Sequence, residues 1–103
     1  MRGDVFALKP PRTAKGHEQD GARFAVVIQS DHLLLSTWLV APTSASAQPT
    51  TFRPEVLVRN RSTRVLTEQA RAIDPGRLGA KIGSLTHNEL RSVDAALRLV
   101  LAL

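Results

Sequence analysis

The chain has 103 residues with 43% hydrophobic content and no cysteine, and its 14 Lys and Arg outnumber its 9 Asp and Glu. This length suits one compact domain over residues 1–103, and the lack of cysteine excludes disulfides and thiolate metal sites. No apolar run approaches the roughly 20 residues of a membrane-spanning helix, and the start of the chain has no apolar signal segment. A cytoplasmic protein without membrane association is therefore expected.

The net charge of +5 indicates a polyanionic partner, either a nucleic acid or an acidic protein. The chain has only four aromatic residues, one Trp and three Phe. This number argues against a base-stacking platform of the RRM type.

Three short strands and two long polar loops, residues 9–22 before the second strand and 42–54 after the third, are predicted in the first half of the chain. Apolar and β-branched runs predict strands at residues 5–8, 23–29 and 38–41, the last ended by Pro42. The loops on either side of the second and third strands approach the roughly 12–15 residues at which loops in compact domains are usually functional.

The second half is predicted to contain a hairpin, a short helical turn and a last strand. Residues 55–58 and 64–67 bracket the turn-like segment 59–62. Asp74 followed by Pro75 is typical of a helix start, and a short strand is expected at 81–83.

A C-terminal helix is the clearest element. Thr86 and Glu89 have the spacing of a capping box. Apolar residues at helical spacing predict a core-facing stripe made of Leu90, Val93, Leu97, Val100 and Leu101. Several short strands followed by one helix predict a mainly β fold of the α+β class, a small barrel or strongly bent sheet with the helix packed against it.

If residues 23–29 and 38–41 form an antiparallel hairpin centred near Leu33, Val26 faces Val40 and Arg23 faces Thr43. An Arg beside a hydroxyl, at the mouth of a loop that carries His17 and Glu18, suits phosphodiester chemistry. The guanidinium matches phosphate oxygens, and Glu18 or His17 is placed to take the proton of a ribose 2′-OH.

No metal or cofactor is expected, because the three His have no metal-ligand spacing and the carboxylates do not cluster. On the residues alone, each candidate also fits an ordinary structural role. A loop Arg or Glu is commonly a solvated charge, and Thr43 after a proline fits a turn. Gln69, in a segment that looks strand-like, fits a residue that satisfies a backbone group. Arg59, Arg61 and Arg64 fit a solvated hairpin face.

Five segments, in the same order along the chain, resemble the MazF/PemK family of toxin–antitoxin endoribonucleases. They are Arg2-Gly3-Asp4-Val5-Phe6; Lys15 to Arg23 continuing through Asp31; Val40-Ala41-Pro42-Thr43-Ser44; Glu68-Gln69 through Leu85; and the C-terminal helix with Val93, Ala96 and Leu97.

The resemblance implies an SH3-like β-barrel with a C-terminal helix, acting as a homodimer. It implies an mRNA-interferase-type toxin that cleaves single-stranded RNA at a short specific sequence, without a metal ion, to 2′,3′-cyclic phosphate and 5′-hydroxyl ends. It also implies an antitoxin partner whose acidic C-terminal segment occupies the RNA groove. By position, Arg23, Thr43 and Glu18 are the catalytic candidates. The RNA-binding candidates are Lys15, His17, Ser44 and Gln69.

One departure from the family is prominent: Phe24 stands where the family nearly always has Pro after the active-site Arg. Phe leaves a backbone N–H to pair and a ring to bury. Two alternatives therefore stand beside the nuclease. One is a non-catalytic binder of the same fold, which sequesters antitoxin or inhibits DNA gyrase. The other is a plain SH3-like RNA-binding module.

Overall fold

A computed structural model describes residues 1–9 and 23–103 of the chain. The candidates Lys15, His17 and Glu18 lie outside the described residues. The described part contains seven strands, two 3-10 turns and one α-helix, in a mainly β arrangement that agrees with the predicted fold class. Among these residues, none of the helices has the length and apolarity to span a membrane.

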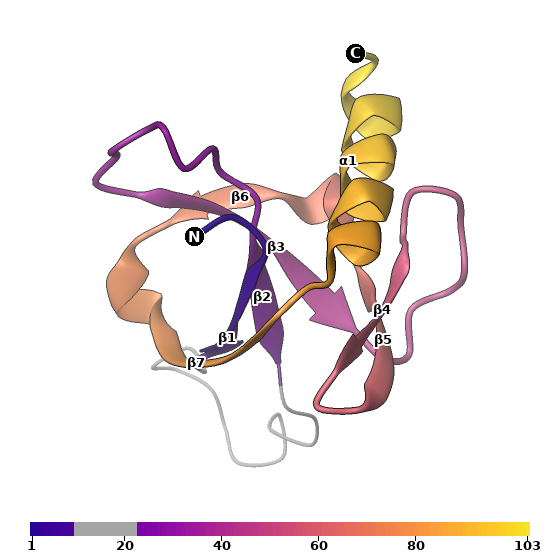
Figure 1. The fold of residues 1–103 in the computed structure, drawn as a ribbon, viewed down its shortest axis with the longest axis horizontal. Helices are drawn as coiled ribbons and strands as arrows, with labels where there is room; N and C mark the ends of the chain where they lie inside the picture. The colour runs from indigo at the N-terminus through magenta and orange to yellow at the C-terminus, as the bar shows by residue number, and fades with distance from the viewer. Residues whose placement is uncertain (10–22) are drawn as a thin grey trace.

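The strands of the described part pair antiparallel, in the order β4-β5-β3-β2-β1-β7, with β6 also pairing with β3. Figure 1 shows the sheet curled on itself, with α1 standing against one side and its C-terminal end projecting past the strands. The bounds are β1 Asp4–Leu8, β2 Phe24–Val27, β3 Trp38–Ser44, β4 Glu55–Val58, β5 Arg61–Val65, η2 Thr67–Gln69, β6 Arg71–Ile73, η3 Pro75–Arg77, β7 Leu78–Ser84 and α1 His87–Leu101.

Pro42 does not end β3, so that prediction is wrong. The Pro42 carbonyl accepts a hydrogen bond from the Leu66 N–H at 2.8 Å. The N–H and C=O of a residue in an antiparallel strand point to the same side, so the donor that proline lacks would face the junction between β5 and β6. At that junction the missing donor breaks no ladder, and the strand continues to Ser44.

The register between β2 and β3 also differs from the prediction by one residue. Val26 pairs with Ala41 and Val27 pairs with Val40, so the hairpin centre lies between Leu33 and Leu34. The Gln29 side chain ties the connection to β3 by accepting from the Leu39 N–H at 3.1 Å and donating to the Leu33 carbonyl at 3.2 Å. In this register the buried Val26 and Ala41 share one face of the sheet, and the buried Val27 and Val40 share the other.

The β4–β5 hairpin is confirmed, but its turn is shorter than predicted. Val58 pairs with Arg61, which leaves only Arg59 and Asn60 in the turn. Both have positive φ, 53° and 63°, the conformation of a type I′ turn, whose twist matches that of the strands. Arg61 and Ser62, which were expected in the turn, belong to β5 instead.

The core consists of two clusters on opposite faces of the sheet. The first lies under α1 and contains Val5, Val26, Ala41, Val65 and the helix residue Val93. The second lies inside the curl of the sheet, where the Phe6 and Trp38 rings meet edge to face at 5.8 Å. Branched aliphatic side chains alternate between the two faces because successive strand residues point in opposite directions.

The capping box at the start of α1 is confirmed: Thr86 Oγ1 accepts from the Glu89 N–H at 3.1 Å, and the Glu89 carboxylate accepts from the Thr86 N–H at 2.8 Å. The predicted stripe is correct through Leu97, which packs partly buried against the same cluster as Val93, and wrong for the last turn. Val93 is buried, whereas Val100 and Leu101 are exposed at 37% and 60%. The helix runs past the edge of the sheet, so its last turn has nothing to pack against among the described residues (Figure 1).

Asp4 joins the ends of β1 and β7 by accepting a hydrogen bond from the Ser84 hydroxyl at 2.9 Å and pairing with Lys81 at 3.4 Å. Burial acts to raise the pKa of this carboxyl. The Ser84 hydroxyl, the N-terminal ammonium and Lys81 together outweigh that effect and hold the pKa below its usual value of 3.8. The ionised form of Asp4 therefore stabilises the fold.

Asp4→Asn should lower the free energy of unfolding at pH 7 by about 1–2 kcal/mol, because the paired carboxylate is replaced by a neutral amide. A lowered pKa in the folded state means that this contribution is complete above the unfolded pKa and disappears as pH falls through the folded pKa. The difference between wild type and variant, measured by urea unfolding from pH 7 down to about pH 2, should therefore close below about pH 4. Asp74→Asn is the control, since Asp74 is exposed and an amide oxygen can still cap η3. A difference that stays constant with pH would contradict this role of Asp4.

Candidate active site

Arg23 lies directly before β2, with its backbone held and its side chain exposed. Its carbonyl accepts a hydrogen bond from the Leu8 N–H at 2.8 Å, which pins this point of the chain to the end of β1. The backbone from which the guanidinium extends is therefore held in place at the end of β2.

Thr43 and Ser44 are the last two residues of β3. Thr43 pairs with Val65 of β5 and is only 6% exposed, whereas Ser44 pairs with Arg64 and is half-buried. Thr43 shares a face of β3 with Ala41, the face on which α1 packs. The hydroxyl therefore lies in a largely apolar setting, where a hydrogen bond to an anion is stronger than in water.

The structure brings Arg23 and Thr43 to adjoining strand ends but does not place them directly opposite each other. Continuing the β2–β3 register by two residues sets Phe24 across from Thr43 and Arg23 across from Ser44. Along a regular ladder this offset would direct Arg23 and Thr43 to opposite faces. Arg23 lies just outside β2, so the ladder does not fix the direction of its side chain.

Gln69 lies at the end of η2, so the strand predicted for this segment is wrong. The Leu66 N–H bonds to the Pro42 carbonyl at 2.8 Å, and the Gln69 N–H bonds to the Leu66 carbonyl at 2.9 Å. Gln69 is thus one tight turn away from the residue before Thr43, and it is exposed. The fold places Arg23 next to Thr43 and Ser44 on the β2 side of β3. Gln69 lies along the other edge of β3, between the Leu66 bond to Pro42 and the pairing of Arg71 with Val40.

Arg53 and Glu68 form an ion pair beside this group that the sequence did not reveal. Arg53 Nη2 lies 2.6 Å from Glu68 Oε2, and Arg53 Nε donates to the same oxygen at 2.9 Å. The hydrogen bonds from Arg53 lower the pKa of the Glu68 carboxyl below its usual value, against a smaller opposing effect of burial. The two residues are 15 positions apart on different elements, and no local pattern links them.

The three hairpin arginines divide into two kinds. Arg59 and Arg61 are exposed at the tip, as a solvated face requires. Arg64 is half-buried, and its Nη1 donates to the Arg53 carbonyl at 2.9 Å, so it holds the β3–β4 connection. Arg59 and Arg61 therefore join Arg23 as exposed cations that can meet a phosphate, whereas Arg64 serves the fold.

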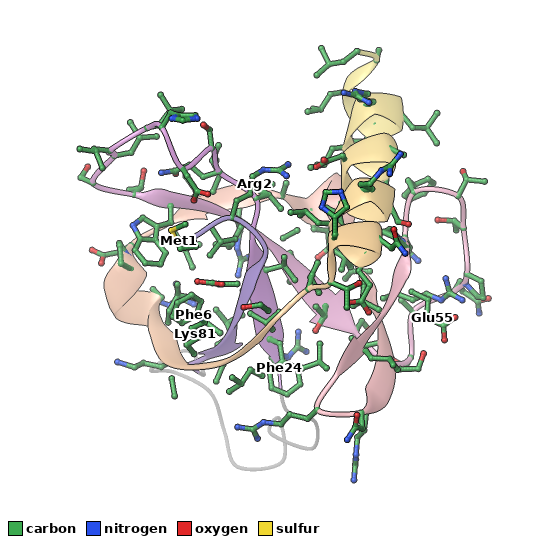
Figure 2. The ribbon with its side chains drawn as sticks, in the orientation of Figure 1. Met1, Arg2, Phe6, Phe24, Glu55 and Lys81 are labelled. Atoms are coloured by element: carbon green, nitrogen blue, oxygen red, sulfur yellow. The ribbon has the colours of Figure 1, made fainter. Side chains whose placement is uncertain are left out.

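Phe24 occupies the position at which the family has proline, and it stabilises the strand end in a different way. Figure 2 shows its ring at the end of β2, and it packs, half-buried, against the cluster under α1. Its backbone pairs with Ala7 of β1 and lies next in register to Thr43. Phe24 therefore stabilises the strand end that carries Arg23 by ring burial, where proline would do so by restricting the backbone.

The sequence profile of the PemK-like, MazF-like toxins of type II toxin–antitoxin systems matches residues 1–101. A protein named as a toxin in Mycobacterium tuberculosis is 45% identical over 73 residues, covering 71% of this chain and 69% of its own length. Endoribonuclease EndoA of Bacillus subtilis is 37% identical over 111 residues, covering 99% of this chain and 94% of its own.

Solved structures agree on the fold. The Mycobacterium tuberculosis toxin MazF-mt6 superposes with a TM-score of 0.75 at 18% identity, covering 97% of both chains. MazF from Deinococcus radiodurans gives 0.76 at 22% identity, covering 99% of this chain and 96% of its own. The predicted mainly β fold with a packed C-terminal helix is confirmed.

Replacing Phe24 by Pro should lower the free energy of unfolding by about 2 kcal/mol, because the ring contacts are lost. Phe24→Leu keeps both the N–H and most of the apolar volume and should cost less than about 1.5 kcal/mol. Urea unfolding followed by the fluorescence of Trp38, the single tryptophan, measures both. Equal stability of Phe24→Pro and wild type would show that the ring adds nothing.

Proposed function

Since this chain belongs to the PemK-like, MazF-like toxins of type II toxin–antitoxin systems, we propose that it is an endoribonuclease that cleaves single-stranded RNA without a metal ion. The observation that carries the proposal is the gathering of Arg23, Thr43 and Ser44 at the adjoining ends of β2 and β3. The relation to a protein named Endoribonuclease EndoA over nearly the whole chain supports it.

The proposed reaction uses the RNA's own 2′-hydroxyl as the nucleophile. The 2′-oxygen attacks the adjacent phosphorus, its proton passes to a base, and the bond from phosphorus to the 5′-oxygen breaks. A 2′,3′-cyclic phosphate and, after proton uptake, a 5′-hydroxyl result. Glu18, outside the described residues, remains the candidate base.

Arg23 is proposed to stabilise the charge that builds on the phosphate oxygens, because a guanidinium can donate to two phosphate oxygens at once. Its exposure leaves it accessible to a phosphate, and its backbone bond to Leu8 keeps it in place. The Thr43 hydroxyl is proposed to donate to the same phosphate. Ser44, Gln69, Lys15 and His17 are the proposed contacts to the rest of the RNA.

The proposed partners in the cell are RNA and an antitoxin with an acidic segment. The net charge of +5 suits both. Solved relatives of this fold include an endoribonuclease in complex with its cognate antitoxin and MazE–MazF complexes of Deinococcus radiodurans. An acidic segment that covers Arg23 would block the phosphate site, which gives inhibition a simple electrostatic cause.

We also propose that the chain acts as a homodimer. The end of α1 exposes Val100 at 37% and Leu101 at 60%, which lie three and four residues after the half-buried Leu97 and extend its apolar face past the sheet. An exposed apolar patch of this kind is typical of a protein interface, and a two-fold contact lets the same patch on two copies cover itself.

Arg23→Ala and Thr43→Ala should each lower the cleavage rate of a mixed-sequence single-stranded RNA in EDTA by about 100-fold or more, since each removes a group that stabilises the reacting phosphate. Gel analysis of the products, with end-group assays for cyclic phosphate, is the measurement. Thr43→Val keeps the shape of the buried side chain and tests the hydroxyl alone. Arg91→Ala, on the exposed side of α1, is the control for lost charge.

Absence of cleavage by folded wild type would reject the nuclease. It would favour the non-catalytic alternatives, an antitoxin-sequestering or gyrase-inhibiting protein or an RNA-binding module. Cleavage that survives in Arg23→Ala would keep the nuclease and reject the proposed site.

Leu101→Asp should convert a dimer of this 11.2 kDa chain to monomer in sedimentation equilibrium, because it places a charge in the proposed contact. Leu57→Asp is the matched control, since Leu57 is exposed to the same degree, 59%, on β4. A dimer that persists in Leu101→Asp and dissociates in Leu57→Asp would move the interface to the sheet.

A further inference from the structure

The side chain of Arg53 ties the connection between β3 and β4, residues 45–54, to η2. Arg53 uses all three nitrogens of its guanidinium: Nε and Nη2 donate to Glu68 Oε2 at 2.9 and 2.6 Å, and Nη1 donates to the Gln48 carbonyl at 3.3 Å. The guanidinium also lies 5.6 Å from the centre of the Phe52 ring. A single residue thus links the middle of the connection, its end and η2.

The backbone carbonyls at the end of the same connection each accept a hydrogen bond from residues 64–67. The buried Thr67 hydroxyl donates to the Phe52 carbonyl. Arg64 Nη1 donates to the Arg53 carbonyl at 2.9 Å, and the Val65 N–H donates to the Pro54 carbonyl at 3.0 Å. Residues 52–54 are therefore fixed against residues 64–68. The hydrogen bonds of the Arg53 guanidinium, called the Arg53 fork below, connect these residues to Gln48 on one side and to Glu68 on the other.

The two segments joined in this way are both sides of the candidate site. Ser44 is the last residue before the connection, and Gln69 follows Glu68 directly in η2. Without the fork, the connection would be held to η2 only through its last residues. Ser44 and η2 are held by backbone pairing with Arg64 and with Pro42, so the part that would become mobile is the connection around Gln48. The fit of an RNA strand that lies across the connection and η2 would then vary.

Charge gives Arg53 a second effect on RNA. The Arg53 and Glu68 side chains are 23% and 26% exposed, so the pair lies at the surface next to Gln69. An unpaired Glu68 carboxylate there would repel a phosphate chain, whereas the paired one is neutralised by direct contact. Removing Arg53 therefore both loosens the connection and exposes a negative charge.

We propose that Arg53 is a positioning residue for RNA, which sets affinity and cleavage-sequence preference by holding the β3–β4 connection on η2 and masking Glu68. The inference rests on the proposed ribonuclease function. It predicts an effect on substrate binding that is separate from the chemistry at Arg23 and Thr43.

Arg53→Ala should raise KM for a single-stranded RNA by about tenfold and spread cleavage over more sequences, while kcat changes by less than about threefold. Arg53→Lys keeps the charge but not the fork, so it should recover most of the affinity and little of the sequence preference. Adding Glu68→Gln to Arg53→Ala removes the exposed charge and should recover affinity in the same way. Arg91→Ala, an exposed arginine on α1, controls for the loss of one positive charge.

These experiments distinguish a failure of the positioning role of Arg53 from a failure of the proposed ribonuclease function. A wild type that cuts no RNA refutes the proposed function. A wild type that cuts, with Arg53→Ala unchanged in KM and in cleavage pattern, overturns the inference and leaves the nuclease standing. If circular dichroism shows Arg53→Ala to be unfolded, Arg53→Lys and Glu68→Gln carry the test: unchanged cleavage patterns in both would equally overturn it.

Discussion

β3 pairs with three other strands along its seven residues, and the positions of those strands follow from it. Its first residues pair with β6, its last two with β5, and its opposite edge with β2. The change of partner from β6 to β5 falls at Pro42, whose missing N–H lies where no ladder bond is required. The bend of the sheet, the separation of the two core clusters and the location of the candidate site at the end of β3 all depend on this division.

The candidate site is built mainly from backbone constraints. The β2–β3 register sets the offset between Arg23 and Thr43, and the Leu66–Pro42 hydrogen bond holds η2 on the opposite edge of β3. Side chains then refine what the backbone has placed: Phe24 packs the end of β2 onto the core, and Arg53 ties the long connection after Ser44 to η2. An offset of one residue in the register would exchange the faces of every side chain involved.

The net charge does not show which arginines can contact a polyanion, because several of them are bound within the fold. Arg2 bonds to the Ile28 carbonyl and to Asp94, and Arg53 and Arg64 hold the β3–β4 connection. These cations serve the fold. Arg23, next to Thr43 and Ser44, and Arg59 and Arg61 at the β4–β5 tip are exposed and can attract a polyanion. The same local field would attract RNA and an acidic inhibitory segment, so competition between them follows from electrostatics.

The sequence by itself determined the elements whose cause is local. Residues close together in the sequence are sufficient to produce the capping box at Thr86, the short turn after Asp74 and the hairpin around Asn60. The same holds for the family-like order of motifs. Only the tertiary structure decided the continuation of β3 through Pro42, the register of Arg23, the Arg53–Glu68 pair and the exposure of Leu101. Each of these depends on which distant segment lies alongside, because burial and hydrogen bonding across the sheet outweigh local preference there.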